Sequence, residues 1–158
     1  MSGGKERAFV VEGKMALPYQ YFAGTVGSKF LVALRDEKKI LGIRCKKCSK
    51  VFIPPRATCE RCFSDLTDNW VELADTGVVT GFTVIRYSEP YQPKKPPHVL
   101  AMIKLDGADT PLVHVLECGD MANAKIGMKV QAVFAEKRTG SILDISHFEP
   151  ICGTASGA

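Results

Sequence analysis

Two closely spaced C-x-x-C pairs are the part of this sequence most suited to carrying chemistry. Cys45 and Cys48 form the first pair, and Cys59 and Cys62 form the second pair after a spacer of ten residues. Four thiolates at such spacing are typical of a tetrahedral site for one divalent ion, most often Zn²⁺. Because the protein supplies all four ligands, no coordination position is left for water or substrate. The motif therefore predicts a structural zinc site, with tetrathiolate iron as the alternative metal.

Two details of this motif depart from the usual pattern. The ten-residue spacer is shorter than the roughly 15–20 residues common between paired C-x-x-C motifs, although it fits a compact ribbon. Rubredoxin-type knuckles also favour glycine after the second cysteine, where the backbone takes a positive φ. Ser49 and Phe63 occupy those positions here. A rubredoxin-type knuckle would therefore need a positive φ at two residues that are not glycine.

No catalytic signature accompanies the metal motif. The sequence has no nucleophile elbow, P-loop, H-E-x-x-H or G-x-G-x-x-G, and we predict no catalytic residues. Cys118 follows an apolar strand and is interpreted as a buried hydrophobe, and Cys152 is interpreted as incidental. The histidines His98, His114 and His147 fall within or beside predicted strands, which favours hydrogen-bonded imidazoles. His98, next to a proline-rich loop, fits that interpretation least well.

The composition is that of an ordinary globular chain with one basic segment. Of the 158 residues, 46% are apolar and 24% are charged, which is enough for a hydrophobic core. No stretch approaches the roughly 20 apolar residues of a membrane span, and no secretory signal is visible. We therefore expect a cytoplasmic protein whose cysteines bind metal and form no disulfides. Residues 35–62 carry a formal charge of +6, part of which would neutralise the charge of about −2 on a Zn(Cys)₄ centre.

The residues before the first cysteine pair predict an arm and a helix. Residues 1–24 contain only short apolar runs, which indicate an irregular arm or an edge strand. Apolar residues at helical spacing predict a helix over residues 26–37. Thr25 or Ser28 is the expected cap, and Gly42 is the expected end of the helical pattern.

The second half of the sequence is predominantly β. Five segments rich in β-branched residues follow one another, and no long helical pattern separates them. This count fits a five-stranded Greek-key barrel of the OB type, in which Gly81 marks a bulge or bend. The predicted strands are residues 77–87, 98–105, 111–117, 129–135 and 142–148.

Together these patterns predict a mainly β protein with one N-terminal helix. A rubredoxin-like zinc ribbon is followed by the five-stranded OB-type barrel. The predicted divisions are an arm and helix at 1–42, the ribbon at 43–68, the barrel at 69–151 and a disordered tail at 152–158.

The proline-rich segment 87–97, between the first two barrel strands, is the best candidate for a functional surface. It contains two tyrosines, two lysines and four prolines. Loops between the strands of such barrels often carry binding sites. The segment could bind a nucleotide or single-stranded nucleic acid or contact another protein. The sequence favours neither of these over a plain solvated connection.

The order of the motifs resembles one known family. I-R-C-x-x-C at residues 43–48 is followed by F-x-P-P-R at 52–56 and then at once by the second cysteine pair. G-x-V-x-x-F-T-V at 77–84 and I-G-M-x-V at 126–130 come later. Over residues 26–149 this arrangement resembles the zinc-ribbon plus OB-fold proteins associated with acyl-CoA metabolism.

The resemblance implies a function that composition does not show. Members of that family look like accessory subunits of thiolases and related condensing enzymes, which bridge catalytic subunits and help to shape the acyl-CoA site. The chain would then be a non-catalytic zinc-binding subunit of a hetero-oligomer. Its thiolase-type partner would supply the catalytic residues. CoA carries phosphates, so Arg86, Lys94 and Lys95 are the expected CoA contacts.

Two other functions stay open at this point. Zinc ribbons and OB barrels both serve in nucleic-acid binding, and the isoelectric point of about 8.7 permits it. Against it, the basic residues cluster around the cysteines and the strands show little interleaving of aromatic and basic residues. An iron-bearing electron carrier is the third hypothesis, and it predicts a coloured protein.

Overall fold

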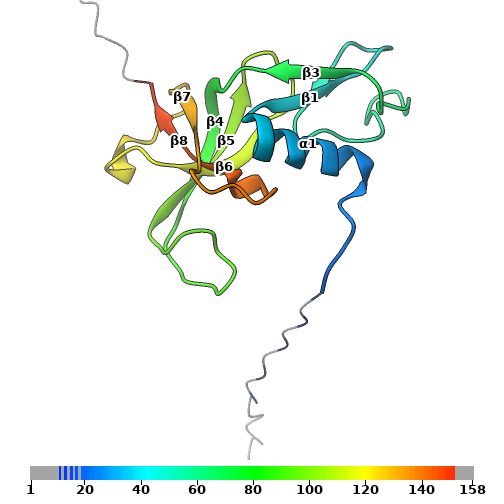
Figure 1. Ribbon diagram of the computed structural model, residues 1–158. Coiled ribbons are helices and arrows are strands. Elements are labelled where there is room, and N and C mark those ends of the chain that lie inside the picture. The colour runs from blue at the N-terminus through cyan, green and yellow to red at the C-terminus, as the bar shows by residue number, and fades with distance from the viewer. Residues whose placement is uncertain (1–10, 12, 14, 16, 18, 152–158) are drawn as a thin grey trace, which may run out of the picture.

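A computed structural model describes residues 11, 13, 15, 17 and 19–151. One helix and a small three-stranded sheet lie beside a closed five-stranded barrel (Figure 1). The elements in chain order are α1 (Gly24–Glu37), β1 (Ile40–Arg44), β2 (Val51–Phe52), β3 (Trp70–Leu73), β4 (Thr76–Ile85), β5 (His98–Leu105), β6 (Leu112–Leu116), the 3₁₀ turn η1 (Met121–Asn123), β7 (Lys129–Phe134), the 3₁₀ turn η2 (Ile142–Asp144) and β8 (Ile145–Pro150). The predicted tail at 152–158, including Cys152, and much of the predicted arm lie outside the described residues.

The helix α1 forms where the apolar spacing predicts it, but its ends differ from the sequence-based expectation. It begins after Ala23, which makes no side-chain capping bond, so the predicted caps at Thr25 and Ser28 are wrong. Both residues lie inside the helix because it starts two residues earlier than expected. At the other end Lys38 takes a left-handed conformation with φ of 55°, so the helix stops before Gly42, which lies in β1.

The small sheet has the order β2-β1-β3, with both pairings antiparallel. β1 is therefore the central strand, and Ile43 has Phe52 on one side and Trp70 on the other. The predicted division at residue 69 separates strands that pair in the structure, since β3 lies with β1. The division itself stays a prediction.

The barrel closes in the order β4-β5-β6-β8-β7, with β7 returning to β4. Every neighbouring pair is antiparallel except β6 with β8. The register of β4 against β5 shifts between Val79 and Gly81, which confirms the predicted bulge. The fold class is thus as predicted, although η2 takes up the first three residues of the expected fifth strand.

One hydrophobic core runs through both parts of the molecule. It receives Phe30 and Leu34 from α1, and Val51 and Ile53 from the segment around β2. The same cluster contains barrel residues from every strand, among them Val79, Ile103, Leu112, Val130 and Phe148. Because the ribbon and the barrel exclude water from a common interior, neither is an independent unit of packing.

Polar contacts fix the ribbon on the barrel beside this core. Asp109, in the turn region between β5 and β6, accepts a hydrogen bond from the Val51 amide at 2.8 Å, and its own amide donates to the Val51 carbonyl at 2.9 Å. Thr110 repeats this pattern on Ile53, with its hydroxyl bonded to both the amide and the carbonyl at 2.8 Å. These bonds satisfy the free edge of β2 and hold it against the barrel.

Within the described part of the chain, no helix combines the length and the apolar character needed to span a bilayer.

Gly77 allows β4 and β5 to approach closely. A Cβ atom at this position would lie 2.5 Å from the carbonyl oxygen of Lys104 and 2.9 Å from the Cα of Leu105. We expect Gly77→Ala to lower the free energy of unfolding by about 1–3 kcal/mol, because backbone must move to relieve the overlap. Urea unfolding measures the change. Gly13→Ala is the control, since no atom of the described residues lies within 4 Å of its added Cβ, and equal losses in both variants would contradict the argument.

The burial of His114 predicts that stability depends on pH. Its Nδ1 accepts a bond from the Val115 amide at 2.9 Å, and its Nε2 lies 3.2 Å from the Ile142 carbonyl. Burial lowers the pKa of His114 below its usual 6.5, so near and below pH 6.5 the unfolded chain binds a proton that the folded chain does not. Stability should therefore fall as the pH falls through this window.

The test compares urea unfolding of the wild type with His114→Gln at pH 5.5 and pH 7.5. Glutamine keeps one donor and one acceptor but does not titrate, so the variant should lose less stability than the wild type on acidification. Identical losses would show that His114 does not carry the effect.

Candidate metal centre

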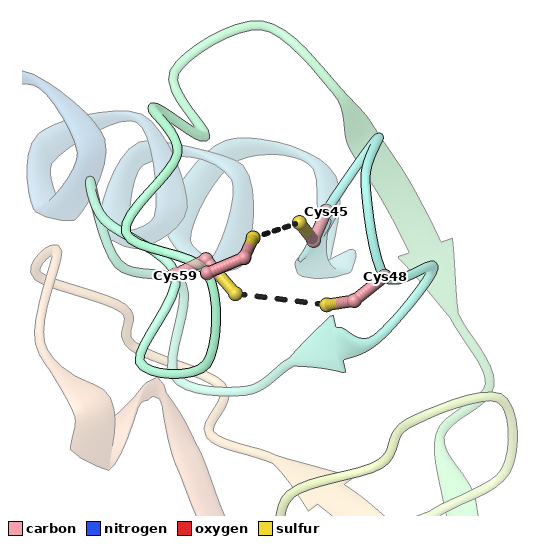
Figure 2. Close-up of side chains that lie close together, drawn as sticks. Cys45, Cys48 and Cys59 are labelled. Carbon is pink, nitrogen blue, oxygen red and sulfur yellow. Dashed lines mark hydrogen bonds between the residues drawn. The ribbon is translucent and has the colours of Figure 1, made fainter.

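The four cysteines of the motif converge in the structure. The Sγ atoms of Cys45 and Cys62 lie 3.4 Å apart, and those of Cys48 and Cys59 lie 3.6 Å apart. All four sulfur atoms lie within 4.8 Å of one another. Figure 2 shows Cys45 and Cys48 directed from one hairpin toward the opposite hairpin, which carries Cys59. A tetrahedron with Zn–S bonds of about 2.3 Å has edges of about 3.8 Å, so the sulfur positions fit a zinc ion.

The two hairpins present their cysteines with the same backbone geometry. The Ser49 amide donates to the Cys45 carbonyl at 2.9 Å, and the Phe63 amide donates to the Cys59 carbonyl at 3.0 Å. Ser49 and Phe63 have φ values of 60° and 54°. The knuckles therefore form in spite of the missing glycines, at a cost of roughly 1–2 kcal/mol for each non-glycine residue in the left-handed region.

Hydrogen bonds stabilise thiolate at Cys45. The hydroxyl of Ser64 lies 3.3 Å from the Sγ of Cys45 and 3.1 Å from that of Cys62. The Ser64 hydroxyl, followed by the backbone amide of Cys48, lowers the pKa of Cys45 to about 5. The two-residue spacing of each pair predicts the ligands but gives no signal for Ser64, which reaches the sulfurs only because the second hairpin folds over the first.

The crowding of the sulfurs acts in the opposite direction at Cys48. The Lys50 amide favours its thiolate, but burial and the neighbouring Cys45 and Cys59 thiols together raise the pKa of Cys48 to about 11. Four negative charges in this space are thus unfavourable by themselves. A divalent cation between the sulfurs would reverse that preference, because thiols that coordinate a metal deprotonate outright.

The centre lies in its own small apolar cluster. Ile43, Phe52 and Leu66 are buried around Cys45 and Cys59. Cys45 and Cys59 are buried, while Cys48 and Cys62 are partly exposed. Four protein ligands suit a structural ion and leave no position for a reacting molecule.

Part of the basic segment is neutralised next to the centre. Glu60 binds Lys50 at 2.6 Å and Arg56 at 2.8 Å. Both cations also lie over the ring of Phe52, at 5.5 Å and 4.7 Å from its centroid. These residues stabilise the second hairpin, so they are not available as an open basic surface.

The three residues expected to contact CoA lie away from the cysteines. Arg86, Lys94 and Lys95 are exposed and belong to the loop between β4 and β5. Lys94 forms an ion pair with Glu117, just after β6. The structure therefore brings Lys94 to a carboxylate of the barrel, while it leaves Arg86 and Lys95 exposed on the loop.

Cys118 is half-buried, and its thiol donates a hydrogen bond to the Asp120 carbonyl at 3.4 Å. Burial, followed by the charge of Asp120, raises the pKa of Cys118. A raised pKa lowers the fraction of thiolate, the form that reacts as a nucleophile.

The fold and the cysteine geometry agree with comparisons to known families. The ChsH2 rubredoxin-like zinc ribbon domain matches residues 33–68, and the ChsH2 C-terminal OB-fold domain matches residues 70–135. The two matches together span more than half of the chain. This protein belongs to the ChsH2 family of zinc-ribbon and OB-fold proteins.

Several relatives support this assignment. A DUF35 domain-containing scaffold protein of Methanocaldococcus jannaschii is 28% identical over 101 residues, which are 64% of this chain and 71% of the relative. The Ltp2–ChsH2(DUF35) aldolase structure has a TM-score of 0.61 at 25% identity and covers 80% of this chain and 95% of its own. A DUF35 family protein of unknown function from Sulfolobus solfataricus has a TM-score of 0.55 at 28% identity, over 70% of this chain and 78% of its own.

The family match and the sulfur geometry point to the same metal. A rubredoxin-like zinc ribbon domain spans both cysteine pairs, and the four cysteines are positioned to bind one ion. Structural zinc held by Cys45, Cys48, Cys59 and Cys62 therefore fits the centre of this ChsH2-family chain.

Ser64 should tune the zinc affinity of this centre. We expect Ser64→Ala to weaken zinc binding about tenfold, since hydrogen bonds to metal ligands commonly contribute at this level. Competition with a chromophoric chelator measures the affinity. Ser88→Ala, which removes an exposed hydroxyl from the β4–β5 loop, is the control and should leave the affinity unchanged. Equal affinities for Ser64→Ala and wild type would contradict the proposed contact.

Proposed function

We propose that this protein is a non-catalytic, zinc-bearing accessory subunit of an acyl-CoA enzyme complex. One observation carries the proposal: the ribbon that holds the Cys₄ centre also packs, through the segment around β2, into the core of the OB barrel. Such a body is suited to holding other proteins in place. The relatives support this role by name, since one is a scaffold protein and another is the ChsH2 part of an aldolase assembly.

The partner in this proposal is a thiolase-type catalytic subunit. Its support is the resemblance of the cysteine and F-x-P-P-R motifs to accessory subunits of thiolases. The narrower candidate is the small subunit of a benzoylsuccinyl-CoA thiolase, which the same motifs resemble. In either case the partner contributes the reacting groups, and this chain bridges subunits and shapes the acyl-CoA site.

The segment before α1 is the proposed docking element. Tyr19, Tyr21 and Phe22 are each exposed by about four fifths, and the segment leads away from the body of the molecule (Figure 1). Aromatic side chains bury a large apolar area at low cost in conformational entropy and are enriched at the centres of protein interfaces. Three of them in four residues are therefore better suited to a protein partner than to solvent.

The β4–β5 loop is the proposed border of the CoA site. Arg86 and Lys95 are exposed there, and either cation suits a phosphate of CoA. Lys94 is already paired with Glu117, so its proposed part is to fix the loop against the barrel. The cytoplasmic location is proposed on the same grounds as the acyl-CoA role.

Nucleic-acid binding is the weaker candidate. Lys50 and Arg56 are paired with Glu60, and Lys94 is paired with Glu117. Pairing removes these cations from a phosphate-binding surface. A salt titration of oligonucleotide binding separates the two functions, because phosphate contacts give a steep dependence on salt.

The test of the proposed function is co-purification from the native host. The tagged chain should retain a thiolase-type protein at constant stoichiometry, and the pair should have thiolase activity that the partner lacks alone. Retention of no such protein, or a partner whose activity is unaffected by this chain, would refute the proposal.

The docking element is tested by Phe22→Ala. Loss of one central aromatic contact should weaken binding to the catalytic subunit by at least about 2 kcal/mol, while the melting temperature stays unchanged because Phe22 is exposed. Ile126→Ala, which truncates an exposed apolar side chain before β7, is the matched control for binding. Equal effects of both substitutions would place the docking surface elsewhere.

A further inference from the structure

Phe63 occupies a position that is unfavourable for its side chain in two ways. The residue is 82% exposed, although a phenyl ring gains stability from burial. Its backbone has a φ of 54°, in the left-handed region that a bulky residue rarely adopts. Ser49, at the equivalent position of the other knuckle, has a φ of 60° but carries a small polar side chain. Backbone strain of this kind concentrates at functional sites, so the ring of Phe63 is better explained by a partner than by the fold.

The metal centre uses the backbone of Phe63 but not its ring. The Phe63 amide donates to the Cys59 carbonyl at 3.0 Å, a bond that any residue except proline can form. Within the described residues, the ring belongs to neither apolar cluster and forms no aromatic pair or cation–π contact. Glycine would build the same knuckle without strain, so the fold does not explain why phenylalanine stands here.

Three cations lie on the tips of the same two knuckles. Lys46 and Lys47 lie between the ligands of the first pair, and Arg61 lies between those of the second pair. All three residues are exposed, and none forms an ion pair with a carboxylate in the described part of the chain. Because the four sulfurs lie within 4.8 Å of one another, the residues that flank them form one surface. We call it the knuckle surface, and it consists of Lys46, Lys47, Arg61 and Phe63.

The composition of the knuckle surface fits an acidic protein surface. A Zn(Cys)₄ centre carries a charge of about −2, and the three exposed cations exceed that charge. Aromatic rings and arginine are enriched at the centres of protein interfaces, and lysine ammonium groups complement carboxylates on a partner. Nucleic acid fits less well, because successive bases stack on several aromatic rings and residues 45–49 and 59–63 contain one aromatic residue.

We propose that the knuckle surface docks on an acidic patch of the catalytic subunit, with the ring of Phe63 in an apolar pocket among the carboxylates. The inference rests on the proposed accessory function and adds a second contact to the exposed segment before α1. The metal then has a role at the interface, since the tips keep their relative positions only while four ligands hold one ion. The strain at Phe63 is offset by contacts that form only in the complex.

The test compares two glycine substitutions in the zinc-loaded full chain. Phe63→Gly and Ser49→Gly should each tighten zinc binding about threefold, since glycine adopts the left-handed conformation without strain. Only Phe63→Gly should also weaken binding to the catalytic subunit, by at least about tenfold, because it removes a central aromatic contact. Competition with a chromophoric chelator measures the first effect, and isothermal titration calorimetry with the purified catalytic subunit measures the second.

Phe63→Tyr is the conservative variant, and it should retain most of the affinity for the catalytic subunit because it keeps the ring. Equal affinity of wild type and Phe63→Gly would overturn the proposal. Equal losses in Phe63→Gly and Ser49→Gly would also overturn it, because the loss would then come from the looser backbone and not from the ring.

The charge of the knuckle surface is tested with Lys47→Gln. The affinity of the wild type for the catalytic subunit should fall as salt is raised, and it should fall less in Lys47→Gln, because salt screens a charge that the variant lacks. Lys125→Gln, which removes an exposed cation before β7, is the matched control. An equal salt dependence in all three chains would contradict an acidic partner. Binding of a single-stranded oligothymidine that Phe63→Gly abolishes would reassign the surface to nucleic acid and overturn the proposal.

Failure of this inference is distinguishable from failure of the proposed function. Loss of binding with Phe22→Ala but not with Phe63→Gly keeps the accessory role and removes the knuckle surface from it. A wild-type chain that retains no thiolase-type subunit refutes the accessory role, and this inference falls with it.

Discussion

The structure depends on one electrostatic constraint, the placement of four cysteine sulfurs within 4.8 Å of one another. Thiolates at this distance repel, burial and the neighbouring thiols raise the pKa of Cys48, and a divalent cation between the sulfurs turns the repulsion into attraction. The attraction compensates the left-handed backbone at Ser49 and Phe63, which neither side chain favours. Metal affinity thus supplies stability that the three buried apolar residues around the centre, Ile43, Phe52 and Leu66, provide only in part.

Packing and hydrogen bonds attach the ribbon, which the metal centre stabilises, to the barrel. The first knuckle leads directly into β2, and Asp109 and Thr110 hold the backbone of Val51 and Ile53. The continuous core on the other side of this strand prevents rotation of the ribbon against the barrel. A scaffold needs this rigidity, because a partner bound at one end must be held at a fixed position relative to a ligand at the other.

The role assigned to Lys94, in the loop between β4 and β5, differs between the sequence and the structure. The sequence presents Lys94 as one of three cations for a CoA phosphate, but in the structure it neutralises Glu117. The pairing joins the loop to the residue that follows β6. Four prolines and one exposed ion pair restrain this loop, and its remaining cations, Arg86 and Lys95, stay open to solvent.

The sequence by itself determined the four cysteines, the helix, the five barrel strands and the bulge at Gly81, because ligand spacing and hydrophobic periodicity are local properties of the chain. It misplaced the helix caps, since Lys38 ends the helix through a backbone conformation that has no marker in the sequence. Only the tertiary structure decided that Ser64 contacts two sulfurs, that the ribbon and barrel share a core, and that His98 is buried. These features join segments distant in the chain, and their energies come from burial and distance, which exist only once the chain has folded.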